Sequence, residues 1–576
     1  MSNYSGAHIC QCLSRIATSR RTTTVTISGD RHKTGKEFVD RVLGLAGGLT
    51  DLGLLPGDVV ALSALNSDLY LEWLLAITFV GGIVAPLNYR WSLEEAKSAM
   101  ETVRPVMLVV DESSSHFSSS FHNDILPSLR WHVFININYP TTDLINMINV
   151  VNSKSCMSSL LIIVFKSKSI INCSQILINH FRFSLMSHQQ QPQKNSICYL
   201  AGTTGRPKGV AISHSALVMQ SMAKLACVGY SEDDVYLHTA PLCHIGGISS
   251  GLAMLMVGGR HILFPKFEAS STLKAIRQFR VTSFLTVPAI MSDIVSLTRR
   301  DKTLLNGMET VTKILNGGGG LSNDLIKEAI NIFPRAKIFS AYGMTETCSS
   351  MTFMTLHDPT STPPPHSSLG ATAGGVCVGK AAPHVEIRIG SEGHDTSSGG
   401  VGKILTRGPH VMLGYWGQTI TNELNSNKDV WLDTGDIGMV DGSGQIWLVG
   451  RNKGRIKSGG ENVFPEEVEG IISQHPGVDT CVVMGVPDQR FTEMVVACIK
   501  PKDKWKWVIG QSNDENTLSA NMIQQFCKQK NLTGFKIPRR FIVWTKPFPL
   551  TTTGKLKRDI IKEEVVSGMQ YISSNL

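Results

Sequence analysis

The chain has 576 residues, with 55 lysines and arginines against 46 aspartates and glutamates and a formal net charge of +9. This length exceeds what one hydrophobic core serves, so we expect a large domain and at least one smaller domain. A hydrophobic fraction of 42% excludes a wholly disordered or collagen-like protein.

The positive charge does not indicate binding to nucleic acid. Residues 144–210 carry seven basic side chains and no aspartate or glutamate, so most of the net charge lies in one stretch. The sequence has no RNP, zinc-finger or basic-zipper pattern, and we expect no nucleic-acid partner. Its 12 cysteines show no paired spacing, which argues against a zinc site or a disulfide framework.

The start of the chain resembles a transit peptide. The first 29 residues contain no acidic residue, and they include Arg15, Arg20 and Arg21 among many serines and threonines.

The longest uncharged run, Trp73 to Leu87, has 15 residues. A bilayer span needs about 20 apolar residues. We therefore expect a buried helix followed by a buried strand here, and no transmembrane segment.

Between residues 36 and 350, short β-branched runs alternate with amphipathic helices, a pattern typical of α/β proteins with mostly parallel sheets. Ser92 and Glu95 form a capping box that opens one of these helices. The predicted strands are 59–65, 83–87, 106–110, 261–264, 283–287, 313–315 and 337–340, and the predicted helices are 69–79, 93–102, 273–279 and 324–333.

Residues 141–194 do not fit this pattern. The segment is rich in serine, isoleucine and asparagine, ends near a run of three glutamines, and has no clear periodicity. It is either a variable surface excursion or a stretch that is not native coding sequence, such as a translated intron.

A glycine-rich loop, Ala201 to Gly209, follows the predicted strand 196–200. Its glycines let backbone N–H groups turn toward an anion, while Thr203 and Thr204 add hydroxyl donors and Lys208 adds charge. The order of residues is not that of a Walker A loop. The composition of the loop suits the binding of a polyphosphate. The alternative interpretation is a glycine-rich hairpin without a ligand.

Three further motifs follow in chain order. Ala341 to Glu346 offers a tyrosine that stacks on a purine, a threonine for a phosphate oxygen and a glutamate for Mg²⁺. Trp431 to Asp436 places a carboxylate at a predicted strand end, where it would bind ribose hydroxyls, and the glycine-rich basic segment 450–462 follows. The loop Pro549 to Lys555 presents one lysine near the C-terminus.

The type of predicted secondary structure changes twice in the second half of the chain. Residues 360–450 read as strands joined by glycine-rich turns, which predicts a small β-rich subdomain. After Arg451, helices return at 465–473 and 518–528, among strands at 480–486, 495–499 and 541–544. We place a domain boundary near Gly454, giving domains 1–453 and 454–576. The final Ser-Asn-Leu resembles a peroxisomal address with one substitution.

Together these motifs resemble the adenylate-forming superfamily, which includes acyl-CoA synthetases, peptide-synthetase adenylation domains and beetle luciferases. The resemblance covers nearly the whole chain except about 112–195. It implies an N-terminal domain of two mostly parallel α/β subdomains and a β-rich subdomain, followed by a small mobile α+β cap. Segments 85–95, 241–247, 314–319 and 534–540 resemble, more closely, the 2-succinylbenzoate–CoA ligases of plants.

The resemblance implies a reaction in two halves. ATP and CoA would be the co-substrates, and Mg²⁺ would be the metal cofactor. An aromatic dicarboxylic acid, 2-succinylbenzoate, would attack the α-phosphate of ATP, and the CoA thiol would then displace AMP. The implied catalytic residues are Lys555, Lys208 and Glu346; the nucleotide-binding residues are Gly202, Thr203, Thr204, Gly205, Gly318, Tyr342, Gly343, Thr345, Asp436 and Arg451; and the magnesium ligands are Thr204 and Glu346.

In this family the C-terminal domain rotates between the two halves, and the hinge position corresponds to Gly454. His244 and Gly319 correspond to the gate between the acyl pocket and the CoA tunnel, with a packed core histidine as the alternative reading of His244. Lys457, Gly459 and Gly460 correspond to the loop on the CoA side. A monomer or homodimer in the chloroplast, the peroxisome or both is expected.

Three departures from the family pattern bear on activity. Leu200 and Ala201 stand where the family usually has two hydroxyl residues, Gly454 replaces an aspartate or lysine, and segment 141–194 is atypical. Two alternatives therefore stay open. The chain is a ligase for another aryl or fatty acid, or it is a nucleotide-binding remnant without catalytic activity.

Overall fold

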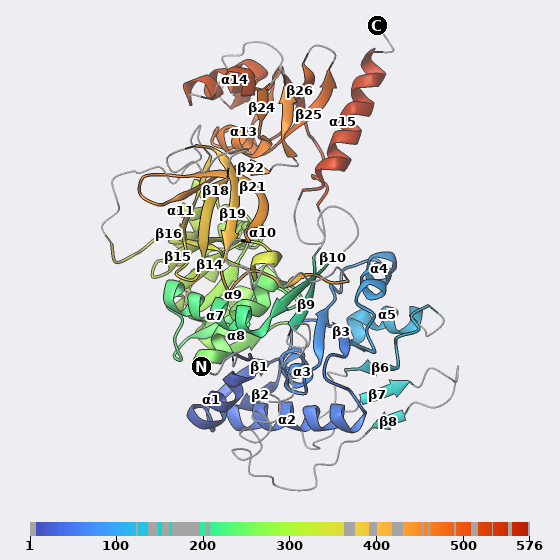
Figure 1. The fold of residues 1–576 in the computed structure, drawn as a ribbon. Helices are drawn as coiled ribbons and strands as arrows, with labels where there is room; N and C mark the ends of the chain where they lie inside the picture. The colour runs from blue at the N-terminus through green and yellow to red at the C-terminus, as the bar shows by residue number, and fades with distance from the viewer. Residues whose placement is uncertain are drawn as a thin grey trace. The chain divides into compact units, whose positions relative to one another are not determined.

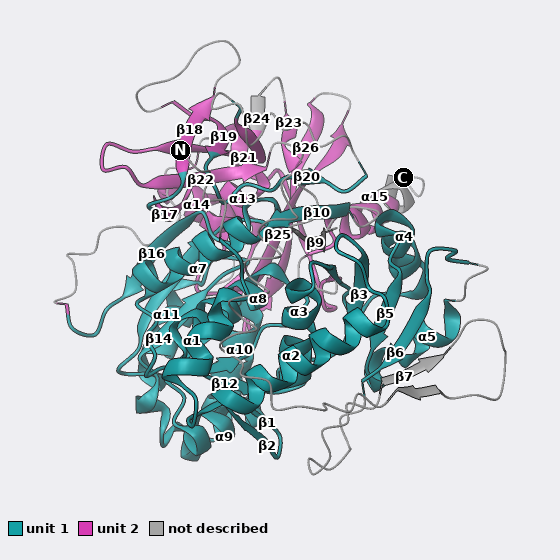
Figure 2. Ribbon diagram, turned by 60° about the horizontal axis from the view of Figure 1, so that its bottom comes forward, with its two compact units in different colours: residues 1–360, 382–385, 407–430 teal, residues 361–381, 386–406, 431–576 magenta. Residues whose placement is uncertain are grey.

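The computed structural model has two compact units, drawn in teal and magenta in Figure 2. The first comprises residues 1–360, 382–385 and 407–430, and the second comprises 361–381, 386–406 and 431–576. The structure describes residues 7–121, 125–135, 148–151, 161–163, 196–201, 208–361, 375–390, 400–417, 430–451, 454–458, 461–488, 491–508, 516–530, 532, 534–550 and 556–573.

A mostly parallel sheet forms the centre of the first unit (Figure 1). Its strand order is β16-β15-β14-β13-β11-β12-β1-β2, and only the outer strands β16 and β2 run antiparallel to their neighbours. These strands are β1 (Thr24–Ser28), β2 (Arg31–Thr34), β11 (Val235–His238), β12 (Arg260–Leu263), β13 (Ser283–Thr286), β14 (Lys313–Asn316), β15 (Lys337–Tyr342) and β16 (Thr352–His357).

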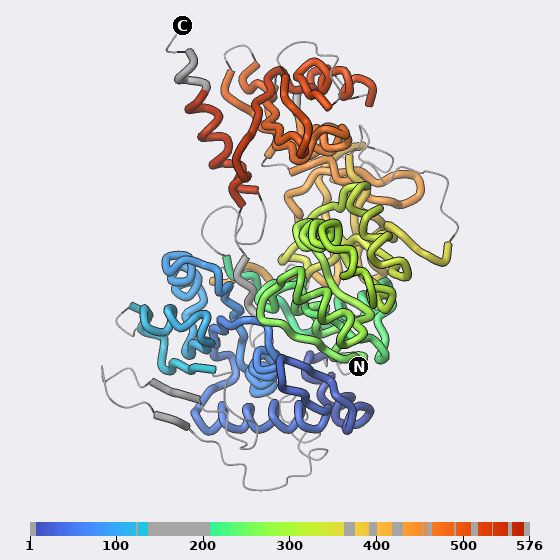
Figure 3. The backbone as a smooth tube through the Cα atoms, turned by 180° about the vertical axis from the view of Figure 1, so that it is seen from behind, coloured from blue at the N-terminus to red at the C-terminus, as the bar shows by residue number. Residues whose placement is uncertain are grey.

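The chain returns to its own start within this sheet. Strand β1 pairs in parallel with β12, more than 200 residues further along, through Thr26 opposite His261 and Ser28 opposite Leu263. Figures 1 and 3 accordingly show the blue N-terminal segment beside the green segment in views from opposite sides. Long-range pairing of this kind fixes the N-terminal segment as part of the first unit.

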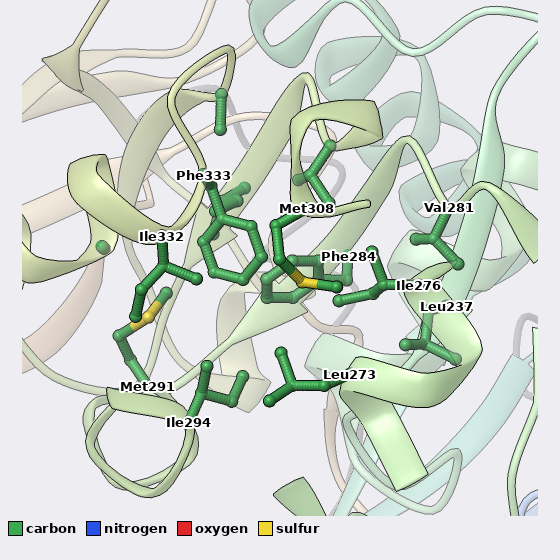
Figure 4. Close-up of a cluster of buried hydrophobic side chains, with 14 of the residues drawn as sticks. Leu237, Leu273, Ile276, Val281, Phe284, Met291, Ile294, Met308, Ile332 and Phe333 are labelled. Carbon is green, nitrogen blue, oxygen red and sulfur yellow. The ribbon is translucent and has the colours of Figure 1, made fainter. Parts of the chain in front are cut away.

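The helices that follow the strands bury their apolar faces against this sheet. The helices of the first unit are α1 (Gln11–Ser19), α2 (Gly35–Asp51), α3 (Asp68–Phe79), α4 (Leu93–Val103), α5 (Ser115–Ser120), α7 (His214–Val228), α8 (Ile245–Val257), α9 (Ala269–Phe279), α10 (Pro288–Arg300) and α11 (Asn323–Ile332). Figure 4 shows one core cluster, in which Phe284 of β13 packs with Leu273 and Ile276 of α9 and with Met291 and Ile294 of α10.

Two further sheets belong to the first unit. The second has the order β4-β3-β5-β6-β7-β8, parallel from β4 to β6, and the third is the antiparallel sheet β20-β10-β9. Their strands are β3 (Val59–Ser63), β4 (Ile83–Pro86), β5 (Met107–Val110), β6 (Trp131–Phe134), β7 (Ile148–Val151), β8 (Leu161–Ile163), β9 (Ser196–Ala201), β10 (Lys208–Ser213) and β20 (Gly414–Tyr415).

The second unit contains two groups of paired strands, and it also contains helices. An antiparallel group follows the order β18-β19-β21-β22-β17, and the C-terminal group follows β24-β23-β26-β25, with β29 parallel to β26. Its elements are β17 (Val376–Ala381), β18 (Glu386–Gly390), β19 (Gly402–Arg407), β21 (Leu432–Val440), β22 (Ile446–Arg451), β23 (Ile456–Ser458), β24 (Glu461–Val463), β25 (Val478–Asp488), β26 (Thr492–Pro501), β29 (Arg540–Val543), α13 (Pro465–Ile472), α14 (Ala520–Gln529) and α15 (Arg558–Ser573).

The predicted α/β class and most predicted elements are confirmed. Helix α4 begins at the predicted capping box, in which the Ser92 hydroxyl accepts from the Glu95 amide and the Glu95 side chain accepts from the Ser92 amide. The run from Trp73 to Leu87 forms the end of buried helix α3 and the buried strand β4. Asp436 was expected at a strand end, and this was wrong, because it lies in the interior of β21.

Three features are absent from the described part of the chain. None of its helices is long and apolar enough to cross a membrane. The nine cysteines whose side chains are described there are all free thiols. No group of three or more histidine, cysteine, aspartate or glutamate side chains there is arranged to hold a metal ion. The domain boundary predicted near Gly454 marks the point about which the C-terminal segment would move, and it stays a prediction.

Candidate active site

Several of the residues singled out in the sequence follow neighbouring parallel strands at one edge of the first sheet. His244 comes after β11, Gly318 and Gly319 come after β14, and Tyr342 ends β15. Strands β11, β13, β14 and β15 are neighbours and run in the same direction, so their carboxyl ends meet at one edge. In open α/β sheets, this edge is where ligands bind.

The loop after β14 is held in a defined shape. The Gly317 amide donates to the Thr286 carbonyl at 3.0 Å, and the Asn316 side-chain amide donates to the Gly319 carbonyl at 2.7 Å. Gly318 has a φ of +71°, a conformation that glycine adopts without strain. The Asn316 Oδ1 atom is buried and has no hydrogen-bond partner in the described part of the chain, which leaves an acceptor next to this loop.

The loop after β15 is tighter still. A Cβ atom at Gly343 would lie 1.7 Å from the Ser349 carbonyl oxygen, so only glycine fits at this position. The Ser349 amide donates to the Met344 carbonyl at 3.1 Å, and the Met351 amide donates to the Tyr342 carbonyl at 2.7 Å. These bonds close the loop, which presents Thr345 and Glu346 in a short 3-10 helix.

Glu346 is linked to Lys208 through a residue that the sequence did not single out, Tyr415. The Tyr415 hydroxyl donates to Oε1 of Glu346 at 3.0 Å, and Lys208 Nζ lies 5.0 Å from the centre of the Tyr415 ring. Burial, the negative charge of Glu346 and the hydrogen bond to it raise the pKa of Tyr415 to about 12. The phenol therefore stays a neutral donor at physiological pH.

The pairing of two short strands brings these three residues together. Strand β20 pairs with β10 so that Tyr415 lies opposite Val210, and the Trp416 amide donates to the Gly209 carbonyl at 2.7 Å. The Met412 amide also donates to the Glu346 carbonyl at 2.9 Å. No sequence motif signals this pairing, because β10 and β20 are separated by about 200 residues.

His244 precedes the first turn of α8 and is partly exposed. Its amide donates to the Pro241 carbonyl at 3.1 Å, and its carbonyl accepts from the Ile248 amide at 3.1 Å, so its backbone is fixed. A fully packed core histidine would be buried, which His244 is not. Its part in a gate stays a prediction.

Asp436 and Arg451, both predicted to bind ribose, contact each other in the second unit. They lie opposite each other on β21 and β22, and Arg451 Nε lies 3.2 Å from Asp436 Oδ1. The Asp436 side chain is 5% exposed and that of Arg451 is 56% exposed. The structure thus pairs these two residues as an ion pair with its cation toward solvent.

The remaining candidates are described in part or not at all. Gly454 is described, and Lys457 is described as part of the backbone of β23. Gly202, Thr203, Thr204, Gly205, Gly459, Gly460 and Lys555 lie outside the described residues, as does most of segment 141–194.

Two family models match the chain. One, described as AMP-binding enzyme, matches residues 13–416, and the other, described as AMP-binding enzyme C-terminal domain, matches residues 467–555. The chain is 50% identical to the 2-succinylbenzoate–CoA ligase, chloroplastic/peroxisomal, of Arabidopsis thaliana, over 100% of both chains. It is 33% identical to the indoleacetate–CoA ligase of Aromatoleum aromaticum, over 64% of this chain and 67% of that relative.

Solved structures share the fold. The anthranilate CoA ligase AuaEII in complex with anthranoyl-AMP has a TM-score of 0.74 at 22% identity, with 97% of each chain covered. The o-succinylbenzoate CoA synthetase of Bacillus subtilis, in complex with its acyl-adenylate intermediate, has a TM-score of 0.70 at 24% identity, with 96% of this chain and 97% of that chain covered. The chain therefore belongs to the AMP-binding enzymes, the adenylate-forming superfamily that its motifs resemble.

Proposed function

We propose that the chain is an ATP-dependent acid–CoA ligase. It adenylates 2-succinylbenzoate and then transfers the acyl group to CoA, giving 2-succinylbenzoyl-CoA, AMP and diphosphate. The observation that carries this proposal is the 50% identity with the Arabidopsis thaliana ligase over the full length of both chains. The arrangement of Glu346, Tyr415 and Lys208 near one sheet edge supports it from the structure.

The first half-reaction needs stabilisation of the negative charge that grows on the α-phosphate and on the leaving diphosphate. Thr203, Thr204 and Lys208 would bind the β- and γ-phosphates, and Gly202 and Gly205 would let the backbone approach them. Lys555 would contact the oxygens between the carboxylate and the α-phosphate. Lys208 is exposed at the start of β10, so its ammonium is available to a phosphate.

The residues of the site fit a magnesium ion. The Oε1 atom of the Glu346 carboxylate accepts a hydrogen bond from the neutral Tyr415 hydroxyl, and none of the described residues forms an ion pair with this carboxylate. Its second carboxylate oxygen is thus a hard oxygen donor suited to Mg²⁺. Glu346 and Thr204 would hold the ion, which when bound would neutralise charge on the phosphate oxygens. Tyr415 keeps the Glu346 carboxylate oriented.

The resemblance to the family assigns the remaining nucleotide-binding roles. Tyr342 would stack on adenine, Gly318, Gly343 and Thr345 would contact the nucleotide, and Asp436 with Arg451 would fix the ribose. The ion pair of Asp436 with Arg451 supports this role, because it holds the buried carboxylate in one orientation.

In the second half-reaction, the segment after Gly454 would rotate, withdrawing Lys555 and bringing Lys457, Gly459 and Gly460 to the path of the thiol. Glycine at this hinge permits backbone rotation, since a Cβ at Gly454 would meet only the Arg451 side chain, at 3.9 Å among the described residues. His244 and Gly319 would line the passage between acid and thiol.

A screen of diphosphate release across carboxylic acids, with ATP and CoA, tests the proposal. We expect the highest kcat/KM with 2-succinylbenzoate; a higher value with a fatty or hydroxycinnamic acid would identify a ligase for another acid. ATP binding by calorimetry without adenylate from any acid would identify a remnant. Sequencing the transcript across codons 140–200 shows whether segment 141–194 and Leu200-Ala201 are native.

We also propose a location in the chloroplast, the peroxisome or both, and a monomeric or homodimeric state. The Arabidopsis thaliana relative, which is named chloroplastic/peroxisomal, supports the location. Fluorescent fusions at either end, viewed with markers of both organelles, test it. Light scattering of the purified chain gives its oligomeric state.

A further inference from the structure

A lysine side chain is buried inside the first unit. Lys224 lies on α7, which packs against α8, and its side chain is fully enclosed. Its ammonium donates to the hydroxyls of Ser249 and Ser250 on α8, at 2.6 and 2.9 Å, and to that of Ser349 at 3.5 Å. Three uncharged hydroxyls thus surround a group that normally carries a positive charge.

The absence of an anion beside Lys224 is unusual. No carboxylate in the described part of the chain forms an ion pair with it, whereas Lys33, which is also buried there, pairs with Asp68 and Glu72. Burial lowers the pKa of Lys224 to about 7. Buried charges are costly unless they are paired, so the charged form of Lys224 is destabilised until a counter-charge lies beside it.

The place of Lys224 connects it to the candidate active site. Ser249 and Ser250 lie in the second turn of α8, which His244 precedes, and Ser349 belongs to the loop that presents Glu346. The ammonium therefore lies between the segment that carries the predicted gate and the loop that carries the predicted magnesium ligand. Serine hydroxyls both donate and accept, so they can turn their hydrogens toward an anion without leaving Lys224 unbonded.

We propose that Lys224, with Ser249, Ser250 and Ser349, binds the second carboxylate of the acid substrate and makes the enzyme specific for a dicarboxylic acid. This inference rests on the proposed function. In 2-succinylbenzoate, the ring carboxylate stays ionised when the chain-terminal carboxylate is adenylated. Its charge-assisted hydrogen bonds to the ammonium and the hydroxyls would supply the missing counter-charge. A monocarboxylic acid would leave Lys224 unpaired, and the site would reject it.

The test compares two acids that differ only in the ring carboxylate, 2-succinylbenzoate and 4-oxo-4-phenylbutanoate. The variant is Lys224→Met, which keeps an unbranched side chain, one atom shorter, and removes the charge. We expect kcat/KM for diphosphate release with 2-succinylbenzoate to fall about 100-fold. The value with 4-oxo-4-phenylbutanoate should stay the same or rise, because the variant no longer buries an unpaired cation.

Controls separate recognition from folding. Lys274→Met, which removes an exposed lysine of α9, should change neither value. Ser249→Ala and Ser250→Ala keep Lys224 and remove one hydroxyl each, so they should lower only the 2-succinylbenzoate value, by about 10-fold. If thermal unfolding shows that Lys224→Met does not fold, the two serine variants serve as the test.

Two results would overturn this inference while leaving the proposed function intact. One is an equal loss of kcat/KM with both acids in the lysine and serine variants, which identifies a purely structural network. The other is unchanged discrimination between the acids. If the wild-type chain does not activate 2-succinylbenzoate at all, the proposed function fails first, and the inference fails with it.

Discussion

The Tyr415 hydroxyl donates a hydrogen bond of 3.0 Å to the Glu346 carboxylate, and the same tyrosine ring lies under the Lys208 ammonium. One side chain thus positions both charged groups proposed to handle the phosphates and their magnesium ion. Tyr415 lies on β20 and Lys208 on β10, so the pairing of these strands sets the spacing of the two charges.

Replacing Tyr415 with phenylalanine should weaken the response to magnesium. The variant loses the hydrogen bond that orients Glu346 but keeps the ring under Lys208. Groups that orient a metal ligand contribute about 10-fold or more to metal affinity. We expect adenylation by Tyr415→Phe to need about 10-fold more Mg²⁺ for half-maximal rate. Tyr415→Leu, which also removes the ring, should be slower still, and an unchanged Mg²⁺ titration in Tyr415→Phe would refute the role of the hydrogen bond.

Replacing Lys555 with alanine should separate the two half-reactions. The lysine is proposed to stabilise charge at the α-phosphate, so its loss should slow adenylation by roughly 10²–10³-fold. Thioester formation from pre-made acyl-adenylate should be largely retained, because that step does not use the lysine. Lys557→Ala, which changes an exposed lysine two residues away, is the matched control. Equal losses in both half-reactions would reject the assigned role.

Alanine at position 343 should disrupt the loop that carries Glu346. Its Cβ would lie 1.7 Å from the Ser349 carbonyl oxygen, a backbone atom that cannot move alone. We expect Gly343→Ala to lower the free energy of unfolding by about 2 kcal/mol or more. Gly44→Ala is the control, because Gly44 is exposed on α2 and a Cβ there would meet open space. Denaturant unfolding of both variants checks this, and equal effects would contradict it.

The buried Lys224 should make stability depend on pH in a defined direction. Its pKa is lowered from 10.5 in the unfolded chain to about 7 in the folded protein. The unfolded chain therefore binds more protons between these values, and stability rises with pH from about 7 to 10, by up to about 1.4 kcal/mol per pH unit. Below pH 7 both states are protonated, and this contribution is flat.

Two neighbours of Lys224 also titrate, and in the folded protein neither changes charge in this window. Burial raises the pKa of the Cys348 thiol to about 12, and it raises that of the Tyr236 phenol, which is bound to Ser250, well above 10. The difference in unfolding free energy between wild type and Lys224→Met, measured from pH 6 to pH 9.5, isolates the lysine. A difference that is constant with pH would mean that Lys224 keeps an ordinary pKa in the folded state.

Local signals in the sequence predicted much of the fold. The capping box at Ser92 placed the start of α4, and the uncharged run after Glu72 gave a buried helix and strand. Asp436 was misplaced at a strand end, whereas β21 continues through it to Val440. Helix α7 was not among the predicted elements, because its buried face carries Gln220 and Lys224 and so shows no apolar stripe.

The part of the site that the sequence did not predict depends on long-range contacts. Tyr415 reaches Glu346 only because β20 pairs with β10, and Lys224 meets Ser349 across more than 100 residues of chain. Neither contact leaves a local pattern, since hydroxyls and lysines are common on surfaces. The glycines at 318 and 343 were predictable as part of a motif, but the close approach that requires Gly343 emerges only from the folded loop.

The central claim is that this chain joins 2-succinylbenzoate to CoA through an acyl-adenylate. The most direct measurement incubates the purified full chain with ATP, Mg²⁺, CoA and 2-succinylbenzoate, and quantifies AMP, diphosphate and thioester by chromatography. Our account predicts equal amounts of the three products, with acyl-adenylate accumulating when CoA is omitted. Release of ADP and phosphate, or ATP binding with no AMP and no thioester, would contradict it.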